Sequence, residues 1–206
     1  MPVKITDPNE MEKFVRTHLA HRLTSLLSPI CRKQDDPAWV GEYNGIRTPT
    51  NDTYRAAKEG SYVMLRLFIE FMGVIGDTKN LGKLKVSSRY NDDLRMESFN
   101  DPWGVVNLKP SDFRADEAFV AQTHRTLCKI NSHFTYDVTS CNPYDRIASL
   151  GDKDWEKAVK LVLNKLDSDF YQKVGQPVVV HQDFKGVFMK MFPAVKKVQG
   201  AALDGT

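Results

Sequence analysis

Four stretches of the 206-residue chain repeat apolar residues at helical spacing, and this periodicity constrains the fold more than any other feature of the sequence. They cover about residues 7–30, 51–73, 111–138 and 152–173. Their lengths are typical of the helices of a bundle. The sequence therefore predicts an all-α protein built as a four-helix bundle.

Two parts of the chain lack this periodicity. Residues 74–113 carry repeated Gly, Pro and Asn turn signals, and a connection of this length is usually functional or disordered. After Gly175 the segment PVVVHQDF is typical of extended structure, and GVFMKMF predicts a short final helix. We therefore expect a helical domain over residues 1–174, with a long loop between helices 2 and 3. A partly extended tail over 175–206 would pack on this bundle or extend from it.

The net charge of +3 lies at the C-terminal end of the chain, from Lys173 onward. In this stretch basic residues exceed acidic ones by three, so residues 1–172, which hold most of the predicted helices, are neutral overall. A neutral body creates no general field for nucleic acid. Any contact with RNA must come from a local cleft or from the tail.

Cysteines and hydropathy bear on the compartment. Cys31, Cys128 and Cys141 form no CxxC pair, which indicates free thiols in a reducing cytoplasm. No apolar run approaches the ~20 residues of a membrane span, and the first residues lack the apolar core of a secretory signal. We expect a cytoplasmic protein that does not bind membranes.

Strong catalytic motifs are missing from the sequence. It contains no GxxxxGK[ST], GxGxxG, HExxH, GxSxG or zinc-ribbon spacing. This lowers the odds of nucleotide hydrolysis, a nicotinamide enzyme or a metalloprotease, and we expect no cofactor.

The third predicted helix carries the best constellation for chemistry. His133 and Asp137 are four residues apart, so a carboxylate can orient an imidazole that acts as a general base. Arg125 and Lys129 precede His133 on the same helix and can bind an anionic group. Asn131 and Tyr136 can add hydrogen bonds. The set is compatible with phosphodiester binding or cleavage, but the simpler interpretation is that His133 lies in a bundle seam, flanked by Ile130 and Phe134.

Two further pairs share helical spacing. Arg66 and Glu70 lie one turn apart within an apolar run, so they must pair or face a cleft. A structural pair is the simpler interpretation, and a phosphate-binding role for Arg66 is the alternative. His124 and Cys128 have a spacing that can chelate a metal. Because no second ligand pair accompanies them, we expect packing and no metal.

These residues also carry a resemblance. Glu59, Arg66 and Glu70 in an apolar helix, LKPSDF at 108–113 and HFTYD at 133–137 resemble motifs in a group of uncharacterised bacterial proteins, in which Ser stands at the position of Gly60. That group is similar to the HEPN superfamily of four-helix bundles, which includes metal-independent ribonucleases of toxin and antiviral systems as well as non-catalytic binding members.

The resemblance implies a HEPN-like protein that binds or cleaves RNA in a bacterial defence or toxin-type role. Catalysis would use His133 as base and Asp137 as its orienting carboxylate. Arg125, Lys129 or Arg66 would stabilise the phosphorane charge, and the resemblance implies a site built across a homodimer. Seven residues separate Arg125 from His133, more than in the family's Arg–His motif. A non-catalytic module that binds a protein or a nucleotide is therefore the alternative.

Overall fold

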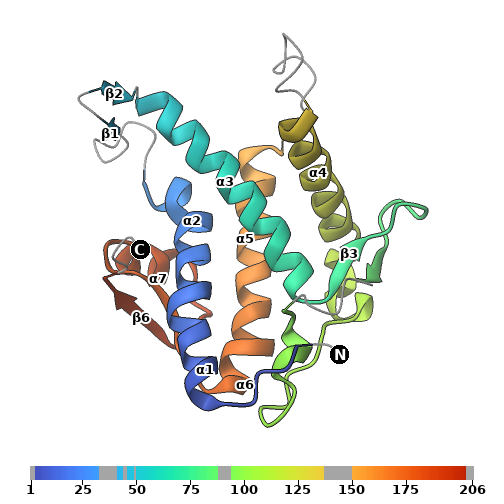
Figure 1. The fold of residues 1–206 in the computed structure, drawn as a ribbon. Coiled ribbons are helices and arrows are strands. Elements are labelled where there is room, and N and C mark those ends of the chain that lie inside the picture. The colour runs from blue at the N-terminus through green and yellow to red at the C-terminus, as the bar shows by residue number, and fades with distance from the viewer. Residues whose placement is uncertain are drawn as a thin grey trace. The chain divides into compact units, whose positions relative to one another are not determined.

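The structure is a computed structural model of the chain. It describes residues 3–32, 41–43, 46–48, 50–87, 94–136 and 150–202, and their side chains except those of 41–43, 46–48, 50–52, 55 and 131–136. Most of these residues are helical, as predicted, and short two-stranded sheets accompany the helices (Figure 1). The arrangement of the helices as a four-helix bundle stays a prediction.

The chain divides into two compact units. One comprises Met1–Pro8 and Leu65–Gly175, and the other comprises Asn9–Met64 and Gln176–Thr206. The C-terminal residues thus belong to the same unit as the N-terminal helical segment, and the expected division into a domain over 1–174 and a tail over 175–206 stays a prediction.

A long helical segment opens the unit that contains the C-terminal residues. α1 (Pro8–Lys13), a π-helical turn (Phe14–Leu19) and α2 (Ala20–Cys31) follow one another without a break. Pro8 suits the first helical position because the N–H that it lacks would have no helical partner. The predicted apolar period is buried along this segment, at Met11, Val15, Leu19, Leu23, Leu26 and Leu27.

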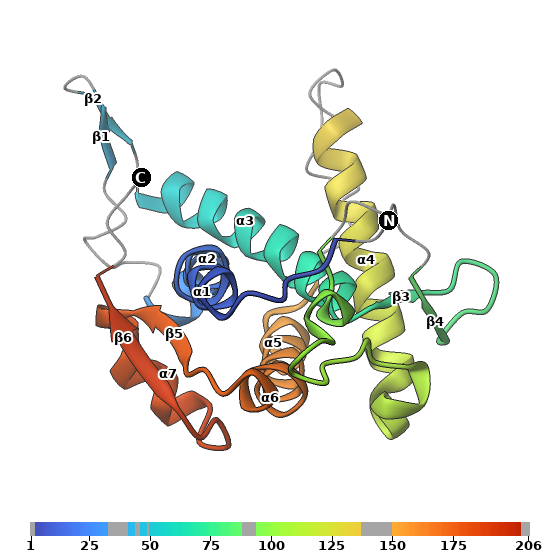
Figure 2. The same ribbon diagram turned by 60° about the horizontal axis from the view of Figure 1, so that its bottom comes forward.

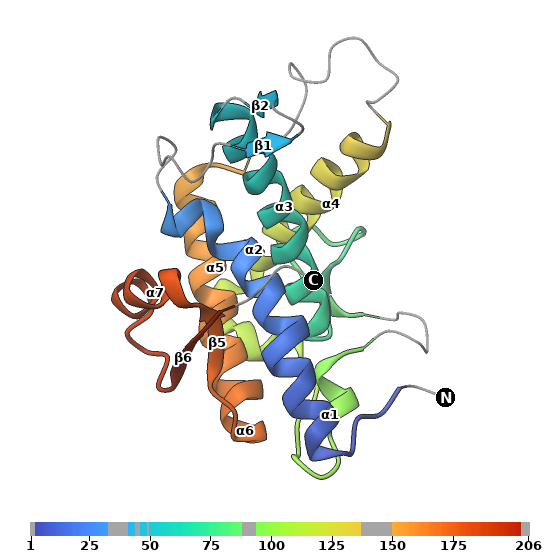
Figure 3. The same cartoon turned by 60° about the vertical axis from the view of Figure 1, so that its left-hand side comes forward.

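The C-terminal residues add a parallel strand pair to the same unit. β5 (Val178–His181) pairs with β6 (Val198–Ala201), and α7 (Lys185–Met191) lies between them in the chain. Parallel strands need such a crossover. Figures 2 and 3 show α7 beside β6. The predicted extended segment and final short helix are thus confirmed. β1 (Gly41–Tyr43) and β2 (Ile46–Thr48) form an antiparallel pair before α3 (Thr50–Phe71).

The last turns of α3 lie in the other unit, where the expected long loop contains a hairpin. The chain leaves α3 at Gly73, whose φ of 89° lies in the left-handed region that favours glycine. β3 (Val74–Gly76) and β4 (Leu84–Val86) then pair antiparallel. A 3₁₀ turn follows at Met96–Phe99. Part of the region expected to be a loop is therefore ordered around a short sheet.

Two long helices complete this unit. α4 (Glu117–Tyr136) follows a 3₁₀ segment at Pro110–Asp116. α5 (Asp152–Leu166) continues through a π-helical turn (Asp167–Tyr171) into α6 (Gln172–Val174). An aromatic cluster lies in the core of this unit, with the Phe170 ring 5.4 Å from Phe71 and 5.1 Å from Phe99. Lys157 of α5 lies 4.2 Å over the ring of Phe119 of α4.

Among the described residues, no helix combines the length and the apolar content that crossing a membrane requires.

Candidate functional site

A buried carboxylate, that of Glu70, is the centre of a polar network between α3 and α4. Glu70 is 4% exposed and lies in the last turn of α3. Its Oε1 accepts hydrogen bonds from Arg66 Nε at 2.8 Å and from His124 Nε2 at 3.1 Å. A buried charge requires such partners. The predicted pairing of Arg66 with Glu70 is confirmed. The bond from His124 links the same carboxylate to α4.

The other ring nitrogen of His124 has a backbone partner. The Gly76 N–H, at the end of β3, donates to His124 Nδ1 at 3.1 Å. Nδ1 must therefore hold a lone pair, which places the proton of the neutral ring on Nε2, facing Glu70. Each ring nitrogen of this buried histidine is thus satisfied by a different element, α3 or β3.

Opposing effects act on the charge of His124. Burial lowers its pKa, but the hydrogen bonds and charges of Cys128 and Glu70 raise it by more, so the pKa lies above its usual 6.5. In the protonated ring Nδ1 also carries a hydrogen, so two N–H groups, those of Nδ1 and of Gly76, would point at each other. Protonation therefore strengthens the contact with Glu70 and breaks the one with Gly76.

Arg66 keeps its charge beside this network. Burial lowers its pKa, while the hydrogen bond and charge of Glu70 raise it by more, so the net direction is upward. The side chain is 29% exposed. Glu70 therefore faces a permanent cation on its own helix and an ionisable ring from α4.

Among the residues that the structure describes, Glu70, His124 and Cys128 form a group that could hold a metal ion. One ligand atom from each lies within 4.8 Å of the others. However, Cys128 Sγ lies 3.7 Å from His124 Nδ1 and 3.8 Å from Nε2. A sulfur equidistant from both nitrogens lies over the ring face, because in the ring plane it would overlap Cε1.

This geometry does not suit a metal ion. A zinc ion bound to either nitrogen would lie in the ring plane, about 2 Å from that nitrogen. The Cys128 sulfur over the ring face would then lie well beyond the Zn–S bond length of about 2.3 Å. Zinc on Nε2 would also move the ring proton to Nδ1, where Gly76 donates. The observed cluster fits a hydrogen-bonded network.

Gly76 allows β3 to approach α4 closely. A Cβ at this position would lie 2.6 Å from the Ala121 carbonyl oxygen and 2.7 Å from Arg125 Cγ. The missing side chain brings the Gly76 N–H within reach of His124, while the stem of Arg125 covers the strand.

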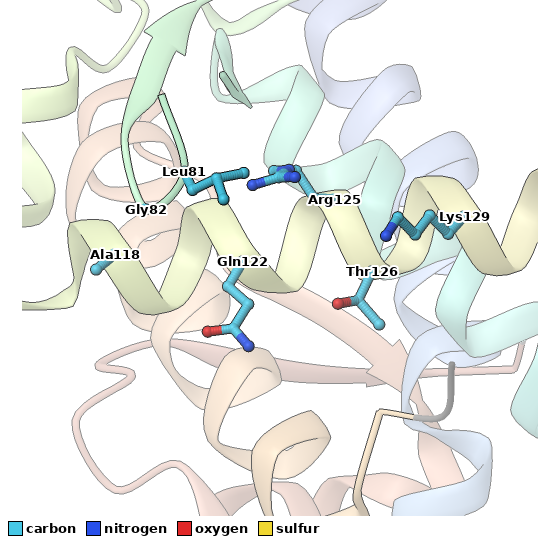
Figure 4. Close-up of a pocket in the computed structure, with 7 residues that line it drawn as sticks. All are labelled: Leu81, Gly82, Ala118, Gln122, Arg125, Thr126 and Lys129. Carbon is cyan, nitrogen blue, oxygen red and sulfur yellow. The ribbon is translucent and has the colours of Figure 1, made fainter. Parts of the chain in front are cut away.

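A pocket of about 420 Å³ lies along α4 beside the tip of the hairpin, and Figure 4 shows its lining side chains. The hairpin contributes Leu81 and Gly82, and α4 contributes Ala118, Gln122, Arg125, Thr126 and Lys129. In the described part of the chain, no carboxylate lies within salt-bridge distance of Arg125. The pocket therefore combines cations, neutral hydrogen-bonding groups and an apolar wall.

The residues proposed from the sequence fall into three groups. Arg125 and Lys129 line the pocket, whereas Arg66 and Glu70 belong to the buried network. His133, Asn131 and Tyr136 lie on α4, with side chains outside the described set, and Asp137 lies outside the described residues.

Helical geometry places some of these positions relative to the pocket. At about 100° per residue, position 133 is offset from Lys129 by about 40° around the axis of α4. Position 133 therefore lies on the pocket side of the helix. Position 131 is offset from Lys129 by about 160° and lies on the opposite side.

Sequence reasoning missed Gly76, Leu81, Gln122 and Thr126. The spacing of Gln122, Thr126 and Lys129 at helical intervals was a usable signal, but the loop residues had none. Comparison of the chain with protein-family models, curated proteins and solved structures finds no match.

Proposed function

We propose that this protein binds single-stranded RNA in the α4 pocket, with Arg125 and Lys129 on a phosphate. The observation that carries the proposal is a pocket that brings both cations together, in which Arg125 has no carboxylate partner among the described residues. Arginine and lysine are the usual ligands of RNA phosphates, and a guanidinium can bind two oxygens at once.

The rest of the lining supports a single strand over a duplex. Leu81 is 73% exposed and, with Ala118, offers an apolar surface to a base or ribose. Gln122 and Thr126 can hydrogen-bond to base edges, which are accessible in unpaired RNA. A pocket of about 420 Å³ lies within the usual range of small-molecule binding pockets.

The resemblance to HEPN-type proteins supports the same proposal. On the basis of this resemblance we also propose that the helices form a four-helix bundle, that the protein is a homodimer, and that it acts in a bacterial defence or toxin-type system. Light scattering on the purified protein tests the dimer directly.

Binding is tested with a double variant and a matched control. Arg125→Ala/Lys129→Ala should weaken the binding of a fluorescently labelled single-stranded RNA by at least about tenfold, since each lost phosphate contact removes electrostatic affinity. Lys153→Ala/Lys160→Ala removes the same charge from exposed positions of α5 and should change the affinity little. Equal losses in both variants, measured by fluorescence anisotropy, would contradict the proposal.

Cleavage is a second candidate activity, favoured by the position of His133 on the pocket side of α4. In a metal-independent reaction, His133 would take the proton of a ribose 2′-hydroxyl with Asp137 as its orienting partner, while Arg125 stabilises the phosphorane charge. His133→Ala should then lower the rate of RNA cleavage by at least about 10²-fold while leaving binding nearly intact. Equal rates in the two proteins would remove His133 from the mechanism, and binding without cleavage in either would leave a non-catalytic module.

A further inference from the structure

The β3–β4 hairpin meets α4 through one strand pair. Gly76 of β3 lies opposite Leu84 of β4. Asp77 and Lys83 form the next pair toward the turn, and Asp77 N donates a hydrogen bond to Lys83 O at 2.8 Å. Ladder bonds alternate along an antiparallel pair, so the N–H groups of Gly76 and Leu84 point out of the sheet.

Both outward N–H groups bind side chains of α4. Gly76 N donates to His124 Nδ1 and Leu84 N donates to Glu117 Oε1, each at 3.1 Å. Glu117 also pairs with Lys83, at 3.3 Å between Oε2 and Nζ. The two acceptors lie seven residues apart, about 10 Å along the helix. The hairpin is therefore attached to α4 at two separate points.

The turn beyond this pair is fixed by its own hydrogen bonds. Asp77 accepts from Lys79 N at 3.0 Å and from Asn80 Nδ2 at 2.8 Å, and these bonds lower the pKa of the Asp77 carboxyl. Lys83 N donates to Asn80 O at 3.1 Å. Because the turn is internally held, the attachment of the strand pair determines where Leu81 and Gly82 lie.

We propose that His124 and Glu117 are positioning residues of the α4 pocket. Neither lines the pocket, but by accepting the two outward N–H groups they hold the hairpin tip as its wall (Figure 4). Ligand affinity then depends on the protonation state of His124. This inference rests on the proposed function for its ligand, but the attachment of the hairpin can be tested without any ligand.

The groups around His124 decide how the attachment responds to pH. Glu70 faces Nε2 from α3, with Arg66 bound to the same carboxylate oxygen, and Cys128 lies over the ring. From β3 the Gly76 N–H donates to the ring, and the stem of Arg125 packs over that glycine. A proton on Nδ1 keeps the bond to Glu70 and leaves the Gly76 N–H without its acceptor.

Two amide substitutions separate the two bonds of His124. The Oδ1 of His124→Asn can replace Nδ1 as acceptor for Gly76 but does not reach Glu70. His124→Gln can reach Glu70 but places no acceptor at Nδ1. Glu117→Gln keeps the acceptor for Leu84 and removes the charge that pairs with Lys83. All three replacements are polar and close in size to the residues they replace, so we expect each variant to fold. Circular dichroism checks this.

Hydrogen exchange of residues 74–86 in the full-length protein is the ligand-free measurement. His124→Gln should speed exchange of the Gly76 amide at least about tenfold, whereas His124→Asn and Glu117→Gln should remain close to wild type. In wild type, protection of this amide should fall as the pH drops, after correction for intrinsic exchange. In His124→Asn it should stay constant.

RNA affinity, measured on the same proteins, should fall several-fold in His124→Gln and remain near wild type in His124→Asn. Equal exchange in the two His124 variants would overturn the attachment through the imidazole, whatever the protein binds. Unchanged affinity in a variant with a released hairpin would overturn the positioning role. Wild-type protein that binds no RNA would refute the proposed function alone, and the exchange data would still decide the attachment.

Discussion

Gly76 has the strictest steric requirement in the candidate site. Replacing it with alanine would press a Cβ to 2.6 Å from the Ala121 carbonyl oxygen, which belongs to the backbone and cannot rotate away. Overpacking of this kind costs about 1–3 kcal/mol. We expect Gly76→Ala to lower the free energy of unfolding by that amount in urea titrations.

Gly60 provides the matched control for this substitution. A Cβ there would have nothing within 4 Å, and alanine is the better helix former. Gly60→Ala should therefore be neutral or stabilising. If the two alanine variants unfolded at the same urea concentration, the close approach of β3 to α4 would be wrong.

His124 gives the stability of the protein a defined pH dependence. Its pKa in the folded state is raised, since burial lowers it but Cys128 and Glu70 raise it by more. A raised pKa contributes stability that is fully present below the unfolded value of 6.5 and is lost as the pH rises through the folded value. Wild type should thus exceed His124→Asn in stability by more at pH 5.5 than at pH 9.

The comparison is made by chemical denaturation of both proteins at the two pH values. A stability difference that grows toward alkaline pH would mean that the bond from Gly76 to the neutral ring outweighs the pairing with Glu70.

At the scale of elements, the periodic segments were the predictable part of the fold. The first helix was predicted from its apolar spacing, and α1, the π-helical turn and α2 occupy that stretch. The fourth was predicted over 152–173, and α5 begins at Asp152 and continues helically to Val174. Long amphipathic helices bury one side, so their periodicity is visible in the sequence alone.

The hairpin was not predictable in the same way. β3 and β4 are three residues each, too short for an alternating pattern to stand out. Their placement depends on acceptors from α4, more than thirty residues away in the chain. The pair of Arg66 with Glu70 was predictable because both partners lie on one helix, but the addition of His124 depends on tertiary structure.

The spacing of His124 and Cys128 on α4 leads to a prediction about metals. Because the sulfur lies over the ring face and Gly76 donates to Nδ1, we expect well under one zinc per chain by elemental analysis after dialysis against zinc and then buffer. Addition of a chelator should leave the melting temperature unchanged. Stoichiometric zinc that disappears in Cys128→Ser would contradict this interpretation of the cluster.

At the scale of the whole molecule, charge limits where RNA can bind. The net charge of +3 comes from residues after Gln172, so the rest of the chain is neutral overall. RNA affinity must then depend on a few local contacts, such as those that Arg125 and Lys129 offer in the pocket. Removing the charges of Arg125 and Lys129 should therefore lower RNA affinity more than removing two charges elsewhere on the surface.

The salt dependence of RNA binding reports on the two pocket cations, because its slope counts phosphate contacts. Each contact with single-stranded RNA contributes about 0.7 to the slope of log K against log salt. Arg125→Ala/Lys129→Ala should therefore reduce the slope by about 1.4, while Lys153→Ala/Lys160→Ala leaves it unchanged. A slope that is the same in wild type and in Arg125→Ala/Lys129→Ala would show that these two side chains do not bind RNA phosphates.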